Sequence, residues 1–144
     1  MSDHLTINAD WIQSLEDANY GVWDWDLITQ RVSYSKGWKA MLGYAEEEIG
    51  ETLAEFQDLV HPDDLAALWT NINQHLAGLT PVFVQEFRMR AKDQSYRWIV
   101  SQGTVVTSTT SGQPARLVAT HKDITESKQA FAKLNIAFAF TMVP

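Results

Sequence analysis

The chain of 144 residues contains no cysteine. Its absence excludes disulfides, thiolate iron–sulfur and zinc sites, and any cysteine nucleophile. Basic residues are also scarce, because 11 lysines and arginines stand against 18 aspartates and glutamates, for a net charge of −7. The basic residues form no cluster along the sequence. Nucleic-acid binders usually carry a basic patch, so we expect no contact with DNA or RNA.

Long apolar runs are missing as well. No stretch approaches the roughly 20 apolar residues that span a bilayer. The opening residues, MSDHLTINADW, lack the basic start and apolar centre of a secretory signal. We therefore expect no membrane contact by this segment and a cytoplasmic location. The length is that of one ordinary domain, and a hydrophobic content of 45% is sufficient for a packed core.

The pattern of apolar residues predicts an amphipathic helix first. Between residues 8 and 19, Trp11, Ile12 and Leu15 recur at helical spacing. Gly21 ends this pattern, and the spacing then changes from about 3.6 to 2. The helix should therefore lie on another part of the domain, with a strand directly after it.

The stretch GVWDWDLITQRVSYS, residues 21–35, predicts a β-hairpin. Trp23 and Trp25 alternate with Asp24 and Asp26, as in a half-buried strand, and residues 31–35 form the returning strand. The two aspartates are about 7 Å apart along such a strand, a spacing that invites comparison with paired catalytic carboxylates. Such pairs usually face a cleft from different elements, so we assign these aspartates to the solvent side.

Short helical segments follow between residues 36 and 79. Gly43 and Gly50 punctuate them, and His61-Pro62-Asp63-Asp64 predicts the start of a longer helix that ends near Gly78. Proline suits the first helical position, and acidic residues in the first turn complement the helix dipole.

Period 2 returns in the second half of the chain. Three strands are predicted at residues 82–90, 95–107 and 115–122, followed by a helix from about Glu126. Five strands interrupted by a helical block indicate an α+β domain, with helices on one face of a single antiparallel sheet. Such a domain can enclose a ligand cavity between the sheet and the helices.

Several short motifs occur in a fixed order. They are Gly21-Val22-Trp23-Asp24-Trp25-Asp26, Leu42-Gly43-Tyr44, His61-Pro62-Asp63-Asp64, Glu86-Phe87-Arg88-Met89-Arg90, Tyr96-Arg97-Trp98-Ile99 and Asp123-Ile124-Thr125-Glu126. Each is weak alone. In this order, across residues 21–128, they resemble the PAS sensor domains of bacterial signalling proteins, in the subgroup with a W-x-W-D opening and a terminal PAC motif.

The resemblance implies a PAS fold, in which a five-stranded antiparallel sheet carries short helices on one face and flanking helices at both ends. It implies an N-terminal flanking helix at residues 1–20, a PAS/PAC domain at 21–125 and an output or linker helix at 126–144. Two departures are visible. Gln94 stands where relatives usually have a turn glycine, and His121 is unusual in the last strand, where it points either into the pocket or away from it.

Strand alternation predicts which side chains face the ligand pocket. The candidates are Trp23, Trp25, Phe83, Gln85, Phe87, Trp98, Val100, Leu117 and Ala119. They are mostly apolar, which favours either a neutral small molecule or a filled core without a ligand. Trp23 and Trp25 are therefore interpreted as core residues by pattern and as pocket wall by position, with the assignment shifting by one wherever a bulge occurs.

Cofactor chemistry is limited by the same composition. Flavin photochemistry through a cysteine adduct is excluded, because the chain has no cysteine, whereas redox flavin binding stays open. His75, on the long helix, is the one candidate for an axial haem ligand by resemblance, although a partly exposed helix histidine is the commoner explanation. We expect no other metal site and find no catalytic constellation.

The resemblance also assigns a relay at the end of the last strand. Asp123, Ile124 and Thr125 would mark the exit into an output helix, with Asp123 accepting a partner and Thr125 capping the helix. Arg97 on the neighbouring strand is the candidate partner of Asp123, and Lys122 is the alternative.

The residues after this exit indicate how the chain would act. Ser127, Phe131, Leu134 and Phe138 recur at spacings suited to a parallel two-helix coiled coil, the alternative being a helix packed on its own sheet. Together with this seam, the resemblance implies a homodimeric, non-catalytic sensory module. The same resemblance implies that it relays a small-molecule or redox signal to a C-terminal output domain, such as a diguanylate cyclase or histidine kinase. The alternatives are a ligand-free PAS interaction adaptor and, less favoured, a small α+β enzyme.

Overall fold

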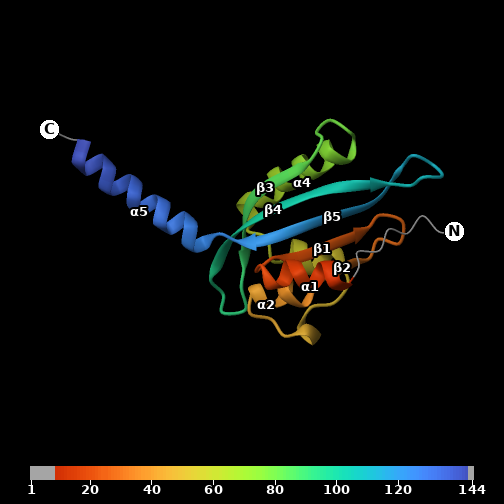
Figure 1. Ribbon diagram of the computed structural model, residues 1–144, viewed down its shortest axis with the longest axis horizontal. Coiled ribbons are helices and arrows are strands. Elements are labelled where there is room, and N and C mark those ends of the chain that lie inside the picture. The colour runs from red at the N-terminus through yellow and green to blue at the C-terminus, as the bar shows by residue number, and fades with distance from the viewer. Residues whose placement is uncertain (1–8, 143–144) are drawn as a thin grey trace.

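The computed structural model describes the backbone of residues 9–142 and the side chains of residues 10–136. The elements in chain order are α1 (Ala9–Asp17), β1 (Gly21–Asp26), β2 (Val32–Tyr34), α2 (Lys36–Met41), the 3₁₀ turn η1 (Glu46–Glu48), α3 (Leu53–Gln57), α4 (Pro62–Leu76), β3 (Phe83–Arg90), β4 (Tyr96–Thr107), β5 (Pro114–Asp123) and α5 (Thr125–Met142). The strands form one antiparallel sheet in the order β2-β1-β5-β4-β3 (Figure 1). The predicted α+β class and the five-stranded sheet are confirmed.

The first and last strands of the chain lie side by side in the centre of this sheet. β1 pairs with β5, so that Trp23 lies opposite Ala119 and Trp25 opposite Leu117. β3, β4 and β5 follow one another as an antiparallel meander. The N-terminal hairpin is therefore joined to the C-terminal strands by a long-range pairing that no local pattern contains.

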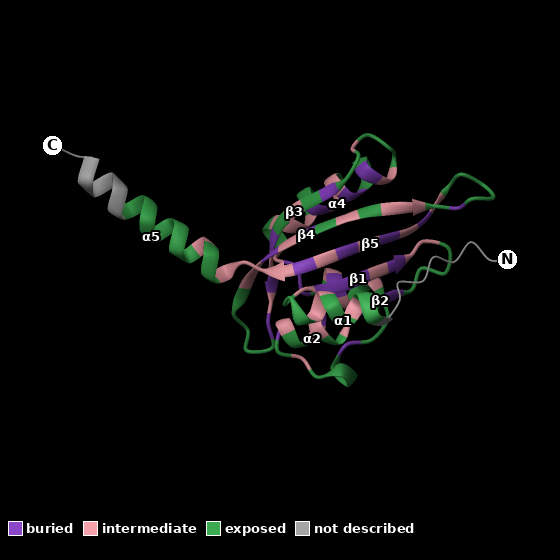
Figure 2. Ribbon diagram, in the orientation of Figure 1, coloured by how far each residue is buried: buried purple, intermediate pink, exposed green. Residues whose placement is uncertain are grey.

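The helical block between β2 and β3 covers one face of the sheet, the inner face. Trp38 of α2, Phe56 of α3, and Leu68 and Ile72 of α4 are almost completely buried there. Figure 2 shows buried positions along β1, β5 and α4. The core is thus the layer between the sheet and α2 to α4.

The opposite, outer face is covered in part by α1. α1 contacts β1, and Ile12 borders a surface recess together with Val22, Asp24 and Arg116. The carboxylate of Asp24 accepts from the Arg116 guanidinium at 2.9 Å. Asp24 therefore lies on the outer side of β1, as predicted, but it is held in an ion pair there.

Polar side chains fix where the inner helices begin. The Ser35 hydroxyl accepts from the Trp38 amide at 3.2 Å and from the Val22 amide at 2.9 Å, so one oxygen caps α2 and closes the β1–β2 hairpin. At the start of α4, His61 Nδ1 accepts from the Asp63 amide at 3.0 Å. Both residues satisfy a backbone donor that the first turn of a helix leaves unpaired.

One helix of the inner layer ends where strand pairing begins. Within the helical block expected between residues 36 and 79, α3 ends at Gln57, because the following residues pair with the edge of β3. The His61 amide donates to the Arg88 carbonyl at 2.9 Å, and the Arg90 amide donates to the Leu59 carbonyl at 2.8 Å. This short pairing covers an edge that would otherwise expose unpaired backbone groups.

The β3–β4 turn contains the residue that departs from the family pattern. Gln94 has a φ of +74°, in the left-handed region that favours glycine, and its amide donates to the Ala91 carbonyl at 2.9 Å. The turn therefore keeps the backbone that a glycine would adopt, at a conformational cost to the glutamine.

Candidate functional site

Most of the predicted pocket residues lie on the inner face and are buried. They are Trp23, Trp25, Phe83, Phe87, Leu117 and Ala119. The alternation of β1, β3 and β5 therefore predicted their orientation correctly. Their contact with a ligand stays a prediction.

The predicted orientation of β4 is wrong. Trp98, together with Val100, lies on the outer face, and the inward side chains of this strand are Ile99 and Ser101, both buried. β4 carries apolar residues on both faces. On the outer face, Trp98 is covered by Arg88 and by Lys128 of α5. Alternation cannot identify the inner face of a strand that is apolar on both sides.

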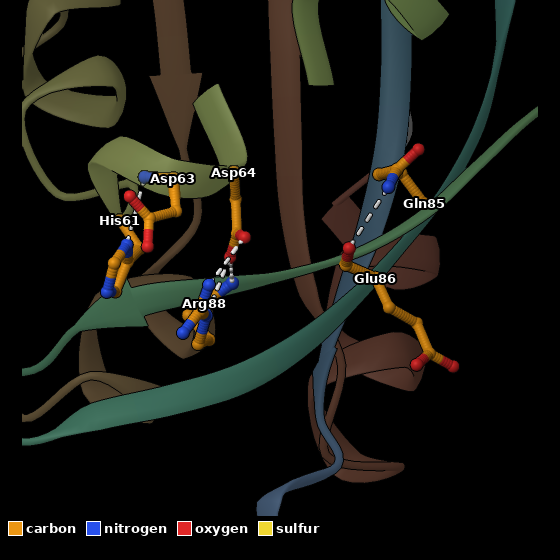
Figure 3. A network of polar contacts seen from close by, with 6 residues as sticks. All are labelled: His61, Asp63, Asp64, Gln85, Glu86 and Arg88. Carbon is orange, nitrogen blue, oxygen red and sulfur yellow. Dashed lines mark hydrogen bonds and ion pairs between the residues drawn. The ribbon is translucent and has the colours of Figure 1, made fainter. Parts of the chain in front are cut away.

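Gln85 differs from the other predicted pocket residues. Its side chain is half-buried on the edge strand β3, where Oε1 accepts from the Asn71 amide group at 2.8 Å. Its Nε2 donates to the Glu86 carbonyl at 3.1 Å (Figure 3). Asn71 of α4 also donates to the Val84 carbonyl at 2.9 Å. Gln85 therefore links β3 to α4, and its polar atoms are engaged within the protein.

His121 of β5 points into the centre of the inner layer. Its Nδ1 accepts from the Trp38 indole N–H at 2.9 Å. Its ring lies 5.7 Å from Phe87, 5.9 Å from Phe56 and 6.3 Å from Trp23, measured between ring centroids. Complete burial lowers the pKa of His121 to about 3, so this side chain is neutral at physiological pH.

Aromatic contacts continue from this cluster toward the far end of β1. Trp23 lies 5.9 Å from Trp25, and Trp25 lies 5.7 Å from Trp69 of α4. The indole N–H groups of Trp23 and Trp25 are buried without a hydrogen-bond acceptor among the described residues. The space between sheet and helices is therefore occupied largely by side chains that contact one another, with two unsatisfied donors among them.

His75 is buried, which corrects the expectation of a partly exposed residue. Its Nε2 accepts from the Val105 amide of β4 at 2.9 Å, so the ring proton is on Nδ1. Nδ1 donates to the Thr80 carbonyl at 2.9 Å. A haem iron at Nε2 would have to displace the Val105 amide. The histidine thus links α4 to the part of β4 that lies beyond the first residue of β3.

The described residues offer neither a cluster of metal ligands nor a membrane-spanning helix. The described residues contain no group of three or more histidine, aspartate or glutamate side chains arranged to hold a metal ion. Within residues 9–142, no helix has both the length and the apolar character needed to cross a bilayer.

The exit from β5 brings the predicted relay residues together. Asp123 Oδ1 accepts from the Thr125 amide at 2.9 Å, and its Oδ2 lies 3.6 Å from Arg97 Nη1. The expected Arg97–Asp123 pair is therefore present. Lys122, the alternative, instead lies over the Tyr20 ring at 5.0 Å.

Thr125 makes a different contact from the one expected. Its hydroxyl accepts from the Trp98 amide of β4 at 2.8 Å and does not cap its own helix, while the Ile124 amide donates to the Trp98 carbonyl at 2.8 Å. Asp123 takes the capping role by accepting from the first helical amide. The root of α5 is thereby bonded to β4 as well as continuous with β5.

A further set of polar contacts near this exit was not anticipated. Arg88 of β3 forms a bidentate pair with Asp64 of α4, with Nε–Oδ2 at 2.9 Å and Nη2–Oδ1 at 2.8 Å (Figure 3). The Arg88 hydrogen bonds lower the pKa of Asp64. Both residues belong to recognised motifs, but only the folded chain brings these motifs into contact.

Beyond its root, α5 extends away from the rest of the chain (Figure 1). Phe131, Leu134 and Ile136 are 65%, 66% and 59% exposed. Ser127, Phe131 and Leu134 of the predicted seam are exposed, whereas the side chain of Phe138 lies outside the described residues. The described apolar residues of this helix therefore do not pack on the sheet.

The family model for the PAS fold matches residues 31–121. The chain belongs to the PAS-fold family. Comparison with curated protein sequences gives no match.

Solved structures resemble this chain over most of its length. A sensory box histidine kinase/response regulator from Burkholderia thailandensis E264 superimposes with a TM-score of 0.75 at 26% identity, covering 90% of this chain and 95% of that chain.

Two solved structures of lower sequence identity share this fold. The N-terminal domain of a diguanylate cyclase with PAS/PAC sensor from Marinobacter aquaeolei has a TM-score of 0.66 at 19% identity, with 76% of this chain and 98% of that chain covered. A domain of a putative light and redox sensing histidine kinase from Haloarcula marismortui has a TM-score of 0.63 at 22% identity, with 79% and 97% covered.

Proposed function

We propose that this PAS domain is a non-catalytic, cytoplasmic input module and that α5 is its output element. The proposal rests mainly on a contrast between the two parts of α5. Its first residue is bonded to β4 through Thr125, whereas Phe131 and Leu134 further along are exposed and apolar. Exposed apolar residues at these spacings suit a second α5 in a parallel coiled coil. A homodimer joined to an output domain, such as a diguanylate cyclase or histidine kinase, fits this arrangement.

The proposed mechanism is a population shift along β5. His121 and Asp123 lie on the same strand, His121 in the aromatic cluster and Asp123 at the base of α5. A small-molecule or redox signal that changes the packing around His121 would move β5, and the Asp123–Arg97 and Thr125–Trp98 contacts would carry this movement to α5. Two arrangements of the paired helices would then differ in rotation or tilt.

Replacing the exit residues should uncouple signal from output. In the parent protein that carries the output domain, Asp123→Asn and Thr125→Val are expected to abolish the response to the signal, because they remove the Arg97 pair and the bond to Trp98. The melting temperature should stay close to that of the wild type. The readout is output activity with and without the signal.

Glu126→Gln is the matched control for this experiment. Glu126 is exposed, lies in the same first turn of α5 and carries the same charge as Asp123. It should leave regulation intact. Normal regulation in both exit variants would contradict the proposal.

The packed inner layer also favours a second candidate function, a ligand-free interaction adaptor. Trp38 and Phe56 both contact His121 in the layer where a ligand would sit. The unsatisfied indole donors of Trp23 and Trp25 argue in the other direction, because a ligand with an acceptor would satisfy them.

Native mass spectrometry and an absorbance spectrum of the purified protein separate the two functions. The adaptor predicts the mass of the chain alone and no band beyond that of the aromatic residues. A copurifying small molecule, or a flavin or Soret band, would instead support the sensor and exclude the adaptor.

A further inference from the structure

α5 makes a second contact with the outer face of the sheet, one turn beyond its root. The ammonium group of Lys128 lies 4.2 Å from the centroid of the Trp98 ring and 2.8 Å from Glu86 Oε1. From Gln129 to Ile136 the described side chains are all exposed. Lys128 therefore contacts both β3 and β4 just before the fully exposed part of α5.

The position of this contact matters for the direction of the helix. Thr125 fixes the beginning of α5 on β4, and a helix held at one point can pivot about it. Lys128 lies three residues further on, about 4.5 Å along the helix axis. Two contacts separated along the axis define a direction as well as a position.

The Trp98 ring is also held by the neighbouring strand β3. The Arg88 guanidinium lies over the same ring, 5.2 Å from its centroid. Arg88 is fixed by Asp64, which also accepts from the Arg88 amide at 2.8 Å (Figure 3). Asp64 lies in the first turn of α4, and α4 contributes Leu68 to the core. A series of ion-pair and cation–π contacts thus leads from α4 on the inner face, around the β3 edge, to α5.

We propose that Lys128, Trp98 and Glu86 form a detachable clamp that sets the angle at which α5 leaves the sheet. Asp64 and Arg88 are its positioning residues, since they hold the ring on which Lys128 sits. This clamp deepens the proposed function and rests on it only in treating α5 as the output element. It supplies a route from α4 to α5 that does not pass through Asp123.

The chemistry of the clamp suits a reversible contact. The side chains of Lys128 and Glu86 are 38% and 49% exposed. Ion pairs and cation–π contacts at such exposure are weak and screened by salt. The clamped and released helices therefore differ little in free energy, and a small displacement of Trp98 suffices to change their populations.

The absence of cysteine allows a direct test by paired spin labels. Nitroxides are attached at Gln102→Cys on the outer face of β4 and at Ala132→Cys on α5, both exposed positions, in the full 144-residue chain. Pulsed electron spin resonance then measures the distance distribution, with excess unlabelled protein added so that labels on two copies do not contribute. Ala132 is about 10 Å from the root along the helix, so a swing of about 30° displaces the label by about 5 Å.

Lys128→Gln is expected to broaden this distribution or to shift its maximum by about 5 Å, whereas Lys128→Arg, which keeps the cation, should preserve it. Lys133→Gln is the matched control, because it removes the same charge from the same helix at an exposed position. An unchanged distribution in Lys128→Gln, or an equal change in Lys133→Gln, would overturn the clamp.

Asp64→Asn tests the positioning residues, because it keeps the shape of the side chain and removes its charge. A purely structural role in α4 would leave the α5 distance unchanged, whereas the proposal predicts a change in the direction seen for Lys128→Gln. If Asp64→Asn lowers the helix content, Arg88→Lys serves instead, since it keeps the charge and loses the bidentate geometry. No change in the folded variant would overturn the α4 route. These distances require no output domain, so their failure is distinguishable from failure of the proposed function.

Discussion

The free energy of unfolding is expected to fall by about 2.5 kcal/mol between pH 7 and pH 4.5 through His121 alone. The folded-state pKa of His121 is lowered to about 3, below the ordinary value of 6.5, because the ring is fully buried. Between these two pH values, His121 is protonated in the unfolded chain and neutral in the folded chain. Stability is therefore complete above pH 6.5 and is lost progressively as the pH falls toward 3.

Carboxylates contribute to acid unfolding in a lower range. Hydrogen bonds lower the pKa values of Asp26, Asp64 and Asp93 below their ordinary 3.8. The stability that these groups provide is present above that ordinary value and is lost as the pH falls below it. Measurements between pH 7 and pH 4.5 consequently isolate the histidine from these three groups.

Urea unfolding of the wild type and of His121→Asn at several pH values provides the measurement. The asparagine oxygen can accept from the Trp38 indole N–H in place of Nδ1, but it does not titrate. The variant should be less stable at pH 7, because it is smaller, and its stability should change by less than about 1 kcal/mol over the same range. An equal pH dependence in both proteins would show that His121 does not determine the acid sensitivity.

Gly103→Ala is expected to destabilise the domain by about 3 kcal/mol, or to prevent folding. Gly103 of β4 lies opposite Ala119 of β5 and opposite Phe83 of β3. A Cβ added there would lie 2.3 Å from the Val118 carbonyl oxygen and 2.8 Å from the Ala119 Cα. These are backbone atoms of a central strand, so the clash cannot be relieved by a change of side-chain rotamer.

Gly112→Ala is the matched control, measured by the same thermal or urea unfolding. A Cβ at Gly112 meets nothing within 4 Å, and its φ of +71° makes alanine unfavourable by only about 1 kcal/mol. A similar loss of stability in the two variants would mean that the close approach of β4 and β5 at Gly103 is relaxed at little cost.

Sequence alternation predicted the orientation of a strand correctly only where neighbouring residues mark its two faces. Alternation in GVWDWD placed Trp23 and Trp25 inward because Asp24 marks the other face of β1. β4 offers no such marker, since Trp98, Ile99 and Val100 are consecutive and apolar. Its orientation depends on Arg88 and α5, which cover Trp98 from elsewhere in the chain.

The histidines show the same division. His61 precedes proline and acidic residues, so its place at a helix start followed from its neighbours, and its Nδ1 does cap α4. The environment of His75 depends on Val105 and Thr80, and that of His121 on Trp38. Val105 and Trp38 lie far away in the sequence, so no spacing near either histidine could predict burial or hydrogen-bond partners.

The sequence by itself determined the α+β class, the order of the elements, the membership in the PAS family and the exclusion of cysteine chemistry. These features depend on residue type, period and motif order, which are local properties of the chain. Only the tertiary structure decided the filling of the inner layer around His121, the outward position of Trp98 and the contact of Lys128 with Glu86. These features arise where segments distant in sequence pack together, and their energies depend on distance and burial, which a linear pattern does not contain.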